Sequence, residues 1–395
     1  MADSPRQPVL LQGIRVLDLS RVLAGPWAGQ LLADYGADVI KVERPGVGDD
    51  TRTWGPYWFG PEEERRSSYY LAANRGKRSI AVDMGKPEGV SLLKQLARQA
   101  DVVIENYKTG DLAKFGLDYA SLQGENPRLI YCSITGFGLS GPYRNRPGYD
   151  LAIQAMGGLM SVTGEADGVP LRVGVALIDV MTGLYSATAI LAALQGRAAT
   201  GKGTHIDCAL LDVAVTTLAN QATSYLVSGK APGRMGNAHP SIVPYQAFAS
   251  ADGHVVLAVG NDGQYRKFCE VAGRMDLATD ARYLTNPQRV TNRASLVPEI
   301  ERVIRTRTSM EWSDALEREG VPCAPIQDIA QVFADAQVIA RGQKLDLVDA
   351  SGPPVPSVAS PAVFDGVRAV SARPPPRLDE QGDEIRAEVT SAPLA

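Results

Sequence analysis

The sequence predicts an α/β protein with a mostly parallel sheet in a large first domain and a second, smaller α+β domain. In the N-terminal half, short apolar strands alternate with amphipathic helices, which is typical of a parallel sheet covered by helices on both faces. Near residue 230 this pattern gives way to a hairpin followed by helices. The length of 395 residues also favours two domains.

The elements of the large domain follow in order along the chain. The first unit is a strand at 14–20, a helix at 25–37 and a strand at 38–45, with Gly36 where a helix commonly ends. Later elements are strands at 78–84, 101–107 and 127–138, a helix at 88–100, a long helix from Asp179 to about Leu194, a turn at 197–207 and a helix at 211–226.

The smaller domain begins with a predicted hairpin around Ala251, Asp252 and Gly253. Helices are expected at about 263–273, 295–307 and 309–319, and a proline-rich extended segment at 352–376. These patterns divide the chain into the first part of the large domain at 1–200, a linker helix and loop at 201–243, the small domain at 244–330, and a return linker with the rest of the large domain at 331–395.

Composition removes several classes of function. A net charge of −4 gives no general footprint for nucleic acid. No apolar run reaches the roughly 18 residues of a membrane helix, and the polar N-terminus does not resemble a signal peptide. The four cysteines are far apart, so we expect no zinc site and a cytoplasmic, reducing location. With only three histidines, a histidine cluster is nearly excluded.

Common nucleotide and hydrolase motifs are also missing. The first strand–helix turn, SRVLAGPWAGQ, lacks GxGxxG, which argues against a nicotinamide-dependent oxidoreductase. The chain has neither GxxxxGK[ST] nor GxSxG. Basic residues do follow predicted strand ends, and aromatic residues lie among them, so either an anionic ligand or ordinary surface charge and an interface would explain them. These residues are Arg44, Arg52, Lys77, Arg78, Trp27, Trp54, Tyr57, Trp58, Tyr69 and Tyr70.

Asp179 has two interpretations. It lies between an apolar run and a long helix, where an aspartate oxygen can accept the free N–H groups of the first turn. A carboxylate can also act as a nucleophile and form a covalent acyl intermediate. Position alone favours the helix cap.

Several motifs, taken together, resemble a known family. The segments LQGIRVLDLSRVLAGP, GADVIKVERPGVGDDTRTWGP, NRGKRSIAVDM, VIENYKTGDLAKFGL and GYDLAIQAMGGLMSVTGE occur in this order. This arrangement resembles the class III CoA-transferases, the family of formyl-CoA and carnitine CoA-transferases and of acyl-CoA racemases, from about residue 9 to residue 376. The resemblance implies a Rossmann-like large domain and an interlocked, ring-like homodimer whose active sites are built from both chains.

The same resemblance makes Asp179 the nucleophile, which takes the acyl group from a CoA thioester and then carries CoA as an aspartyl-CoA thioester. Coenzyme A is then a substrate, and no metal is required. The implied CoA contacts are Val22, Leu23, Ala24, Arg44, Val82, Asp83, Met84, Gly85, Asn106, Tyr107, Lys108, Lys114 and Tyr149.

Within the family, the racemase alternative is disfavoured because Tyr149 stands where racemases carry a histidine, and a tyrosine is a poor acid–base group near neutral pH. A formyl-CoA specialist is disfavoured because Leu23 replaces the family's glutamine and the glycine-rich lid is missing. A CoA-binding protein without activity is a further alternative, which the retained Asp179 disfavours.

The segment at 233–248 resembles the succinyl-CoA:glutarate branch of the family, which implies a dicarboxylate acceptor. Candidate substrate contacts are Arg52, Trp54, Tyr69, Arg234, His239 and Ser241. Arg234 and His239 could equally belong to a polar hinge loop. After the proline run at 374–376 the sequence departs from the family pattern, and we expect the C-terminal helix to be short or absent.

Overall fold

The computed structural model describes residues 10–350 and 352–391. The N-terminal residues 1–9, most of the segment judged unlike a signal peptide, lie outside the described residues. The chain divides into two compact units. Unit 1 comprises residues 1–159, 172–227 and 336–395, and unit 2 comprises 160–171 and 228–335.

Unit 1 is built on a six-stranded sheet in the order β5-β2-β1-β6-β7-β8. All its neighbouring strands are parallel, as the alternation of strands and helices predicted. The strands are β1 (Arg15–Asp18), β2 (Asp38–Glu43), β5 (Lys77–Ala81), β6 (Val102–Glu105), β7 (Ile130–Thr135) and β8 (Thr204–Ala209).

This strand order is that of a doubly wound Rossmann sheet, so the predicted fold class is confirmed. The chain moves outward from β1 through β2 to β5, then returns to the other side of β1 and continues through β6, β7 and β8. The order therefore reverses between β1 and β6. In open sheets of this kind, ligands bind beyond the strand ends at the reversal.

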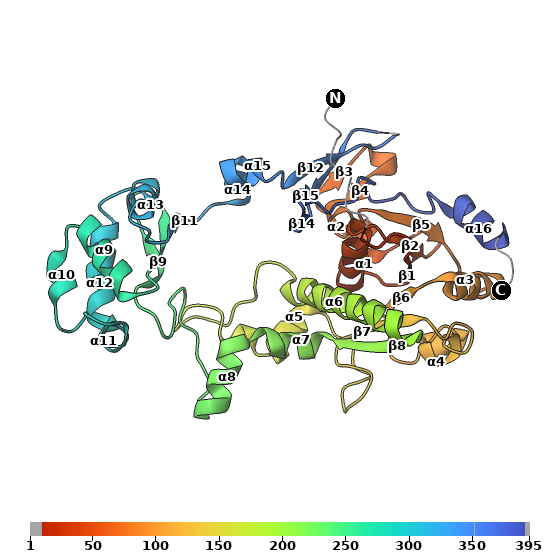
Figure 1. The fold of residues 1–395 in the computed structure, drawn as a ribbon, viewed down its shortest axis with the longest axis horizontal. Coiled ribbons are helices and arrows are strands. Elements are labelled where there is room, and N and C mark those ends of the chain that lie inside the picture. The colour runs from red at the N-terminus through yellow and green to blue at the C-terminus, as the bar shows by residue number, and fades with distance from the viewer. Residues whose placement is uncertain (1–9, 351, 392–395) are drawn as a thin grey trace. The chain divides into compact units, whose positions relative to one another are not determined.

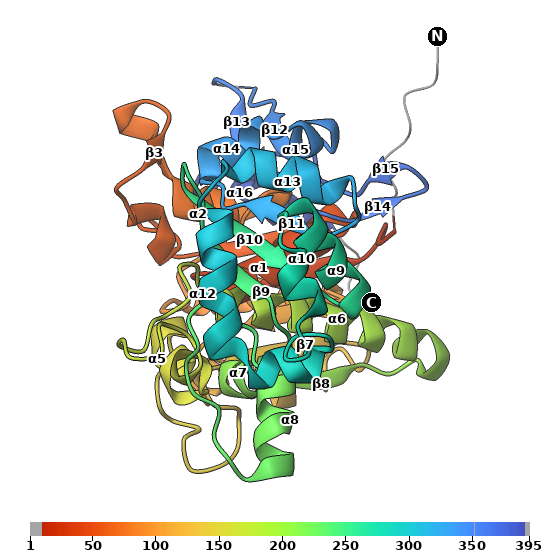
Figure 2. The ribbon, with the colours of Figure 1, turned by 90° about the vertical axis from the view of Figure 1, so that its left-hand side faces the viewer.

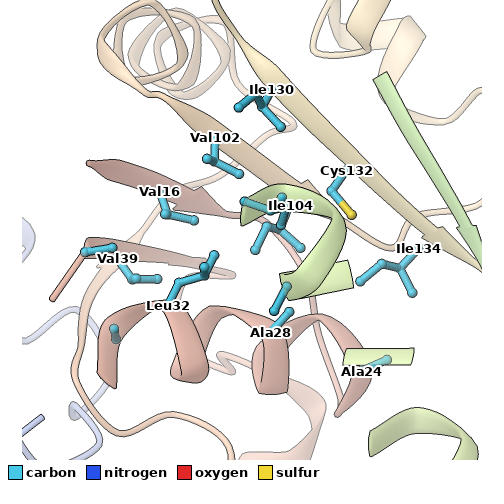
Figure 3. Packing of buried hydrophobic residues seen from close by; sticks show 14 of the residues in the cluster. Val16, Ala24, Ala28, Leu32, Val39, Val102, Ile104, Ile130, Cys132 and Ile134 are labelled. Atoms are coloured by element: carbon cyan, nitrogen blue, oxygen red, sulfur yellow. The ribbon is translucent and has the colours of Figure 1, made fainter. Parts of the chain in front are cut away.

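Each strand near the centre is buried on both faces. Val16 in β1 packs on one face with Val39, Val102 and Ile130, whereas the next residue, Leu17, packs on the other. Figure 3 shows the first of these clusters, with Ala24, Ala28 and Leu32 of α1 below the strands. Helices α1 (Ala24–Asp34) and α6 (Leu177–Thr200) cover this face and lie beside each other (Figure 1).

The opposite face is covered by α3 (Pro87–Gln99), α4 (Tyr119–Leu122) and the C-terminal helix α16 (Gly382–Ser391). Ile385 and Val389 of α16 are buried in that core. Of the two outcomes expected for the C-terminal helix, short or absent, absence is excluded, because the divergent sequence forms ten residues of helix with an apolar inner face.

The other helices of the large sheet region are α2 (Ser68–Ala72), α5 (Asp150–Met156), α7 (Leu210–Thr217), α8 (Ala219–Ser228) and α15 (Ala336–Ala340). Short hairpins are formed by β3 (Trp58–Phe59) with β4 (Arg66–Ser67), β12 (Lys344–Leu347) with β13 (Val355–Val358), and β14 (Val363–Phe364) with β15 (Val367–Arg368). Single 3₁₀ turns are η1 (Asp50–Thr53), η2 (Glu62–Glu64), η3 (Leu112–Phe115) and η4 (Leu159–Ser161).

Unit 2 has its own core around a three-stranded antiparallel sheet (Figure 2). The predicted hairpin is formed by β9 (Tyr245–Ala249) and β10 (His254–Ala258), and β11 (Cys323–Pro325) adds a third strand. Its helices are α9 (Asp262–Val271), α10 (Met275–Thr279), α11 (Asn286–Thr291), α12 (Arg293–Ile304), α13 (Ser309–Glu317) and α14 (Ile329–Ala334).

Three sequence expectations need correction. The segment at 197–207, expected to be a turn, begins as the end of α6 and continues into edge strand β8. The helix expected at 211–226 is broken where Ala219 adopts a positive φ of 46°. A stretch long and apolar enough to span a membrane does exist in α6, with a mean hydropathy of 1.7 over 18 residues. One face of this helix packs against α1 and the sheet, through Ile178, Ala187 and Ile190.

Candidate active site around Asp179

Asp179 lies in the first turn of α6, but it does not cap that helix. The N-cap residue is Ala176, which makes no side-chain capping bond. Asp150 of α5 fills this role from outside the helix: its Oδ1 accepts the N–H groups of Ile178 at 2.8 Å and of Asp179 at 3.2 Å. The cap interpretation of Asp179 is therefore wrong, and its own carboxylate is left for other contacts.

A chain of buried hydrogen bonds fixes this arrangement. Gln154, one helical turn after Asp150, donates its Nε2 to the Asp150 Oδ2 at 2.6 Å. The Oε1 of Gln154 accepts the N–H of Val173 at 2.9 Å. Both side chains are buried, so α5 holds the start of α6 and the segment leading into it.

The environment of Asp179 makes its carboxylate unusually basic. Burial, and secondly the negative charge of Asp150, raise its pKa from 3.8 to about 7. At neutral pH the ionised and neutral forms are therefore both populated. Shifts of this size are common among groups placed to react.

Asp179 faces a cavity at the reversal point of the sheet. The turn after β1 supplies Arg21, Val22, Leu23 and Ala24, and the segment after β6 supplies Asn106, Tyr107, Lys108 and Thr109. The segment after β7 supplies a third part of the wall, including Arg144, Arg146 and Tyr149. The carboxyl ends of three adjacent strands thus meet at one site, as expected for this fold.

Eight of the sequence-predicted residues line this cavity, namely Val22, Leu23, Ala24, Asn106, Tyr107, Lys108, Tyr149 and Asp179. A second hollow shares Arg21 and Tyr107 with it and contains the predicted Arg44, Val82 and Met84. Asp83 and Gly85 adjoin that hollow, where the Asp83 carboxylate accepts the N–H of Gly85 at 2.9 Å. Lys114 lines neither cavity and forms an exposed ion pair with Asp111 at 2.6 Å.

Arg52 is placed differently from the expected substrate contact. Its Nε and Nη2 donate to the two carboxylate oxygens of Glu43 at 2.6 and 2.7 Å, and Nη2 also donates to the hydroxyl of Tyr70. The guanidinium lies 3.8 Å from the centre of the Tyr70 ring. These contacts give Arg52 a structural role within unit 1.

Trp54 and Tyr69 contact each other edge to face, with ring centres 5.1 Å apart. Neither lines the cavity. Burial raises the pKa of Tyr69, and the charges of Asp179 and Asp150 raise it further, so its hydroxyl lies within electrostatic reach of that pair.

The other predicted substrate contacts belong to unit 2. Arg234 donates to the backbone carbonyls of Glu165 and Gly168 at 3.2 and 2.7 Å. His239 accepts the N–H of Ser241 through Nδ1 at 3.1 Å. These bonds order the loop at 233–241 within its own unit.

Sequence reasoning missed Asp150, Arg21, Arg144 and Arg146. Asp150 is the last residue of the GYD motif, directly after Tyr149, the position that distinguishes the racemases. The three arginines follow strands β1 and β7, and the rule that ligands bind beyond strand ends could have identified them. No group of three or more metal-ligating side chains occurs within the described ranges 10–350 and 352–391.

The fold and the cavity define an α/β protein with a doubly wound sheet and a cavity at the point where its strand order reverses. A family model described as CoA-transferase family III matches residues 11–382. The chain belongs to this family and is an enzyme that transfers CoA, so the resemblance found from its motifs is confirmed.

Several relatives are similar over nearly the whole chain. Succinate–glutarate CoA-transferase of Agrobacterium fabrum is 50% identical over 396 residues and covers 98% of both chains. Succinyl-CoA:glutarate CoA-transferase of Homo sapiens is 44% identical over 380 residues, covering 96% of this chain and 86% of the relative. A crystal structure of a CAIB/BAIF family protein from Brucella suis has 51% identity and a TM-score of 0.88, covering 97% of this chain and 100% of its own.

Proposed function

We propose that this enzyme moves CoA from succinyl-CoA to a dicarboxylate such as glutarate, with Asp179 as the covalent carrier. The observation that carries this proposal is the Asp179 carboxylate at the wall of a cavity, with its backbone fixed by Asp150 and its pKa raised to about 7. The names of the two CoA-transferase relatives support succinyl-CoA as donor and glutarate as acceptor.

The proposed reaction exchanges one thioester for another through four steps. The Asp179 carboxylate attacks the thioester carbonyl of succinyl-CoA, releases CoA thiolate and forms a mixed anhydride. The thiolate attacks the aspartyl carbonyl, which releases succinate and leaves an aspartyl-CoA thioester. The acceptor carboxylate attacks this thioester to form a second anhydride, and CoA thiolate then attacks the acceptor acyl carbon and frees Asp179.

The raised pKa of Asp179 suits this chemistry. A carboxylate that is more basic than usual is a stronger nucleophile, yet a pKa of about 7 leaves a large ionised fraction at neutral pH. Asp179 also lies in the first turn of α6, where the helix dipole favours the negative form. No general base is needed to activate a group that ionises by itself.

The two adjoining hollows are proposed to hold CoA. Their shared residues Arg21 and Tyr107 make them parts of one extended surface. Arg21, Arg44, Lys108, Arg144 and Arg146 give it positive charge for phosphates. Arg21 and Arg44 both pair with Asp50, at 3.1 and 2.6 Å, so a phosphate at this point would compete with that carboxylate.

We further propose that the enzyme is an interlocked homodimer in the cytoplasm. Apolar side chains are exposed on α6, α7 and α8, namely Leu184, Tyr185, Val215, Tyr225, Leu226 and Val227. A second copy of the chain would cover this surface and bring its own residues to the acceptor site. The four cysteines are unpaired, which fits a reducing compartment. A folded monomer in sedimentation at low concentration would contradict the dimer.

The substrate assignment is tested by incubating the protein with succinyl-CoA and a panel of mono- and dicarboxylates. We expect transfer to glutarate and related dicarboxylates, and transfer to monocarboxylates alone would overturn the assignment. Asp179→Ala should abolish both turnover and the hydroxylamine-sensitive acyl adduct. Asp383→Ala is the matched control, because Asp383 also lies in the first turn of a helix but is fully exposed.

A further inference from the structure

The turn at 20–22, directly before α1, contains a strained residue at the wall of the cavity. Val22 has a φ of 71°, in the left-handed region that β-branched side chains strongly disfavour. It lines the same cavity as Asp179. A strained residue persists only where its surroundings enforce the conformation.

One buried ion pair holds this turn at two points. The N–H of Val22 donates to both carboxylate oxygens of Asp49 at 3.3 Å. Asp49 accepts a 2.8 Å hydrogen bond from the Nζ of Lys41, and the same Nζ donates to the carbonyl of Ser20 at 3.0 Å. The pair therefore fixes both ends of the turn, although neither Lys41 nor Asp49 lines the Asp179 cavity.

Asn106 holds the middle of the turn. Its Oδ1 accepts the N–H of Arg21 at 2.9 Å and its Nδ2 donates to the carbonyl of Arg21 at 2.7 Å. Ser20 donates its N–H to Asp18 at 3.0 Å. Each N–H of residues 20–22 is thus bound by a side chain, and Asp49 holds the strained one.

Burying the charged side chains of Lys41 and Asp49 costs free energy, and the conformation of the turn that they hold explains why both are present. The side chains of Lys41 and Asp49 are both 0% exposed. Burial alone would raise the pKa of Asp49, but Lys41 and the hydrogen bonds from Thr51 lower it to about 2, so the pair stays charged at neutral pH. Buried ion pairs are often no more stabilising than apolar side chains of similar volume, so their geometry is the better explanation for their presence.

Building on the function proposed above, we propose that Lys41 and Asp49 are positioning residues for CoA transfer. Both residues border the second hollow, but their side chains are 0% exposed and neither lines the Asp179 cavity. They act through Val22: they hold it in its left-handed conformation and so fix the part of the cavity wall that lies next to the acyl-CoA thioester. Without the pair, the turn relaxes and the thioester is displaced from the nucleophile.

The test asks whether glycine at position 22 removes the need for Asp49. Asp49→Asn keeps the side-chain shape but loses the charge that binds Lys41, and its amide N–H₂ replaces one acceptor oxygen. We expect turnover to fall about 10- to 100-fold, as for misplacement of a reacting group by about 1 Å. Because glycine adopts positive φ without steric cost, the same substitution in a Val22→Gly background should reduce turnover by less than about 3-fold.

Equal fold losses in the two backgrounds would overturn the proposal, because Asp49 would then act independently of Val22. Asp34→Asn is the control for stability. Asp34 forms an equally buried ion pair with Arg75, at 2.6 Å, that does not touch the turn. It should lower the melting temperature without the selective loss of turnover seen for Asp49→Asn.

A crystal structure of the Asp49→Asn variant gives a readout that does not depend on turnover. We expect Val22 to leave the left-handed region and the CoA affinity, measured by calorimetry, to fall. An unchanged turn would overturn the proposal. If the wild-type enzyme transferred CoA to no acceptor, the proposed function would fail, whereas this structural and binding test of Lys41 and Asp49 would still give its answer.

Discussion

The backbone N–H of Asp179 donates a hydrogen bond of 3.2 Å to the carboxylate of Asp150, which belongs to a different helix. Asp150 therefore acts on Asp179 in two ways. It fixes the first turn of α6 through hydrogen bonds, and its charge opposes ionisation of the neighbouring carboxyl group. A substitution that keeps the hydrogen-bond acceptor at position 150 but removes its charge separates these two effects.

The first prediction concerns the pH dependence of the reaction. With a pKa of about 7 in the free enzyme, Asp179 should give kcat/KM an acid limb that rises through pH 7 as the carboxylate ionises. Asp150→Asn keeps an acceptor oxygen but removes the charge, so the midpoint should move to lower pH. A midpoint that does not move would contradict the electrostatic role of Asp150.

The second prediction concerns stability. The folded pKa of Asp179 lies above its usual 3.8, so folding favours the neutral form and ionisation destabilises the fold as pH rises from about 4 to 7. Asp179→Asn should therefore raise the free energy of unfolding at pH 8, by about 2 kcal/mol for a partly exposed group. The gain should disappear near pH 4. Equal gains at both pH values in denaturant titrations would assign the effect to packing instead.

Most of the large sheet was predictable from the sequence, because buried strands are short apolar runs separated by helices. Strand β8 was not, since it is an edge strand whose sequence THIDCA is half polar and has only one buried residue. The break at Ala219 was also missed, because alanine is a helix former and gives no local signal for a positive φ.

The site was predictable only in part. The motifs placed Asp179 and seven other predicted residues, and these lie around one cavity. The roles of Asp150 and Asp49 depend on contacts with residues 29 and 27 positions away, respectively, which a single sequence does not contain. The ion pair of Arg52 was not predictable for the same reason, because its partner Glu43 lies on β2 and only the fold brings the two together.

The third prediction concerns the crossing of α1 and α6. A Cβ added to Gly183 would lie 2.7 Å from the carbonyl oxygen of Ala24 and 2.9 Å from the Cβ of Trp27. Gly183→Ala should therefore lower the free energy of unfolding by about 1–3 kcal/mol. Turnover should also fall, because Asp179 lies one helical turn before Gly183.

Gly196 provides the matched control on the same helix. A Cβ there would meet nothing within 4 Å, so Gly196→Ala should stabilise the protein by up to about 1 kcal/mol through helix propensity alone. Both variants can be compared by chemical denaturation and by transfer assays. Equal effects of the two substitutions on stability and turnover would show that the crossing of α1 and α6 does not depend on close packing at Gly183.

The last prediction concerns the C-terminal segment, which covers the β5 edge of the sheet. The side chains of Asp379 and Gln381 accept the N–H groups of Ala81 and Ser79 on edge strand β5, at 2.8 and 2.9 Å. Ile385 of α16 follows these residues and is 0% exposed in the core of unit 1. Ile385→Ala should lower the free energy of unfolding by about 2–4 kcal/mol.

Glu384 tests whether charge or apolar packing holds this helix. It pairs with Arg78 at 3.0 Å but is 59% exposed, so Glu384→Gln should change stability by less than about 1 kcal/mol. Hydrogen exchange at Ser79 and Ala81 should quicken in Ile385→Ala and stay unchanged in Glu384→Gln, because release of the helix uncovers the strand edge. The reverse order of effects would mean that the ion pair, and not Ile385, attaches α16 to the sheet.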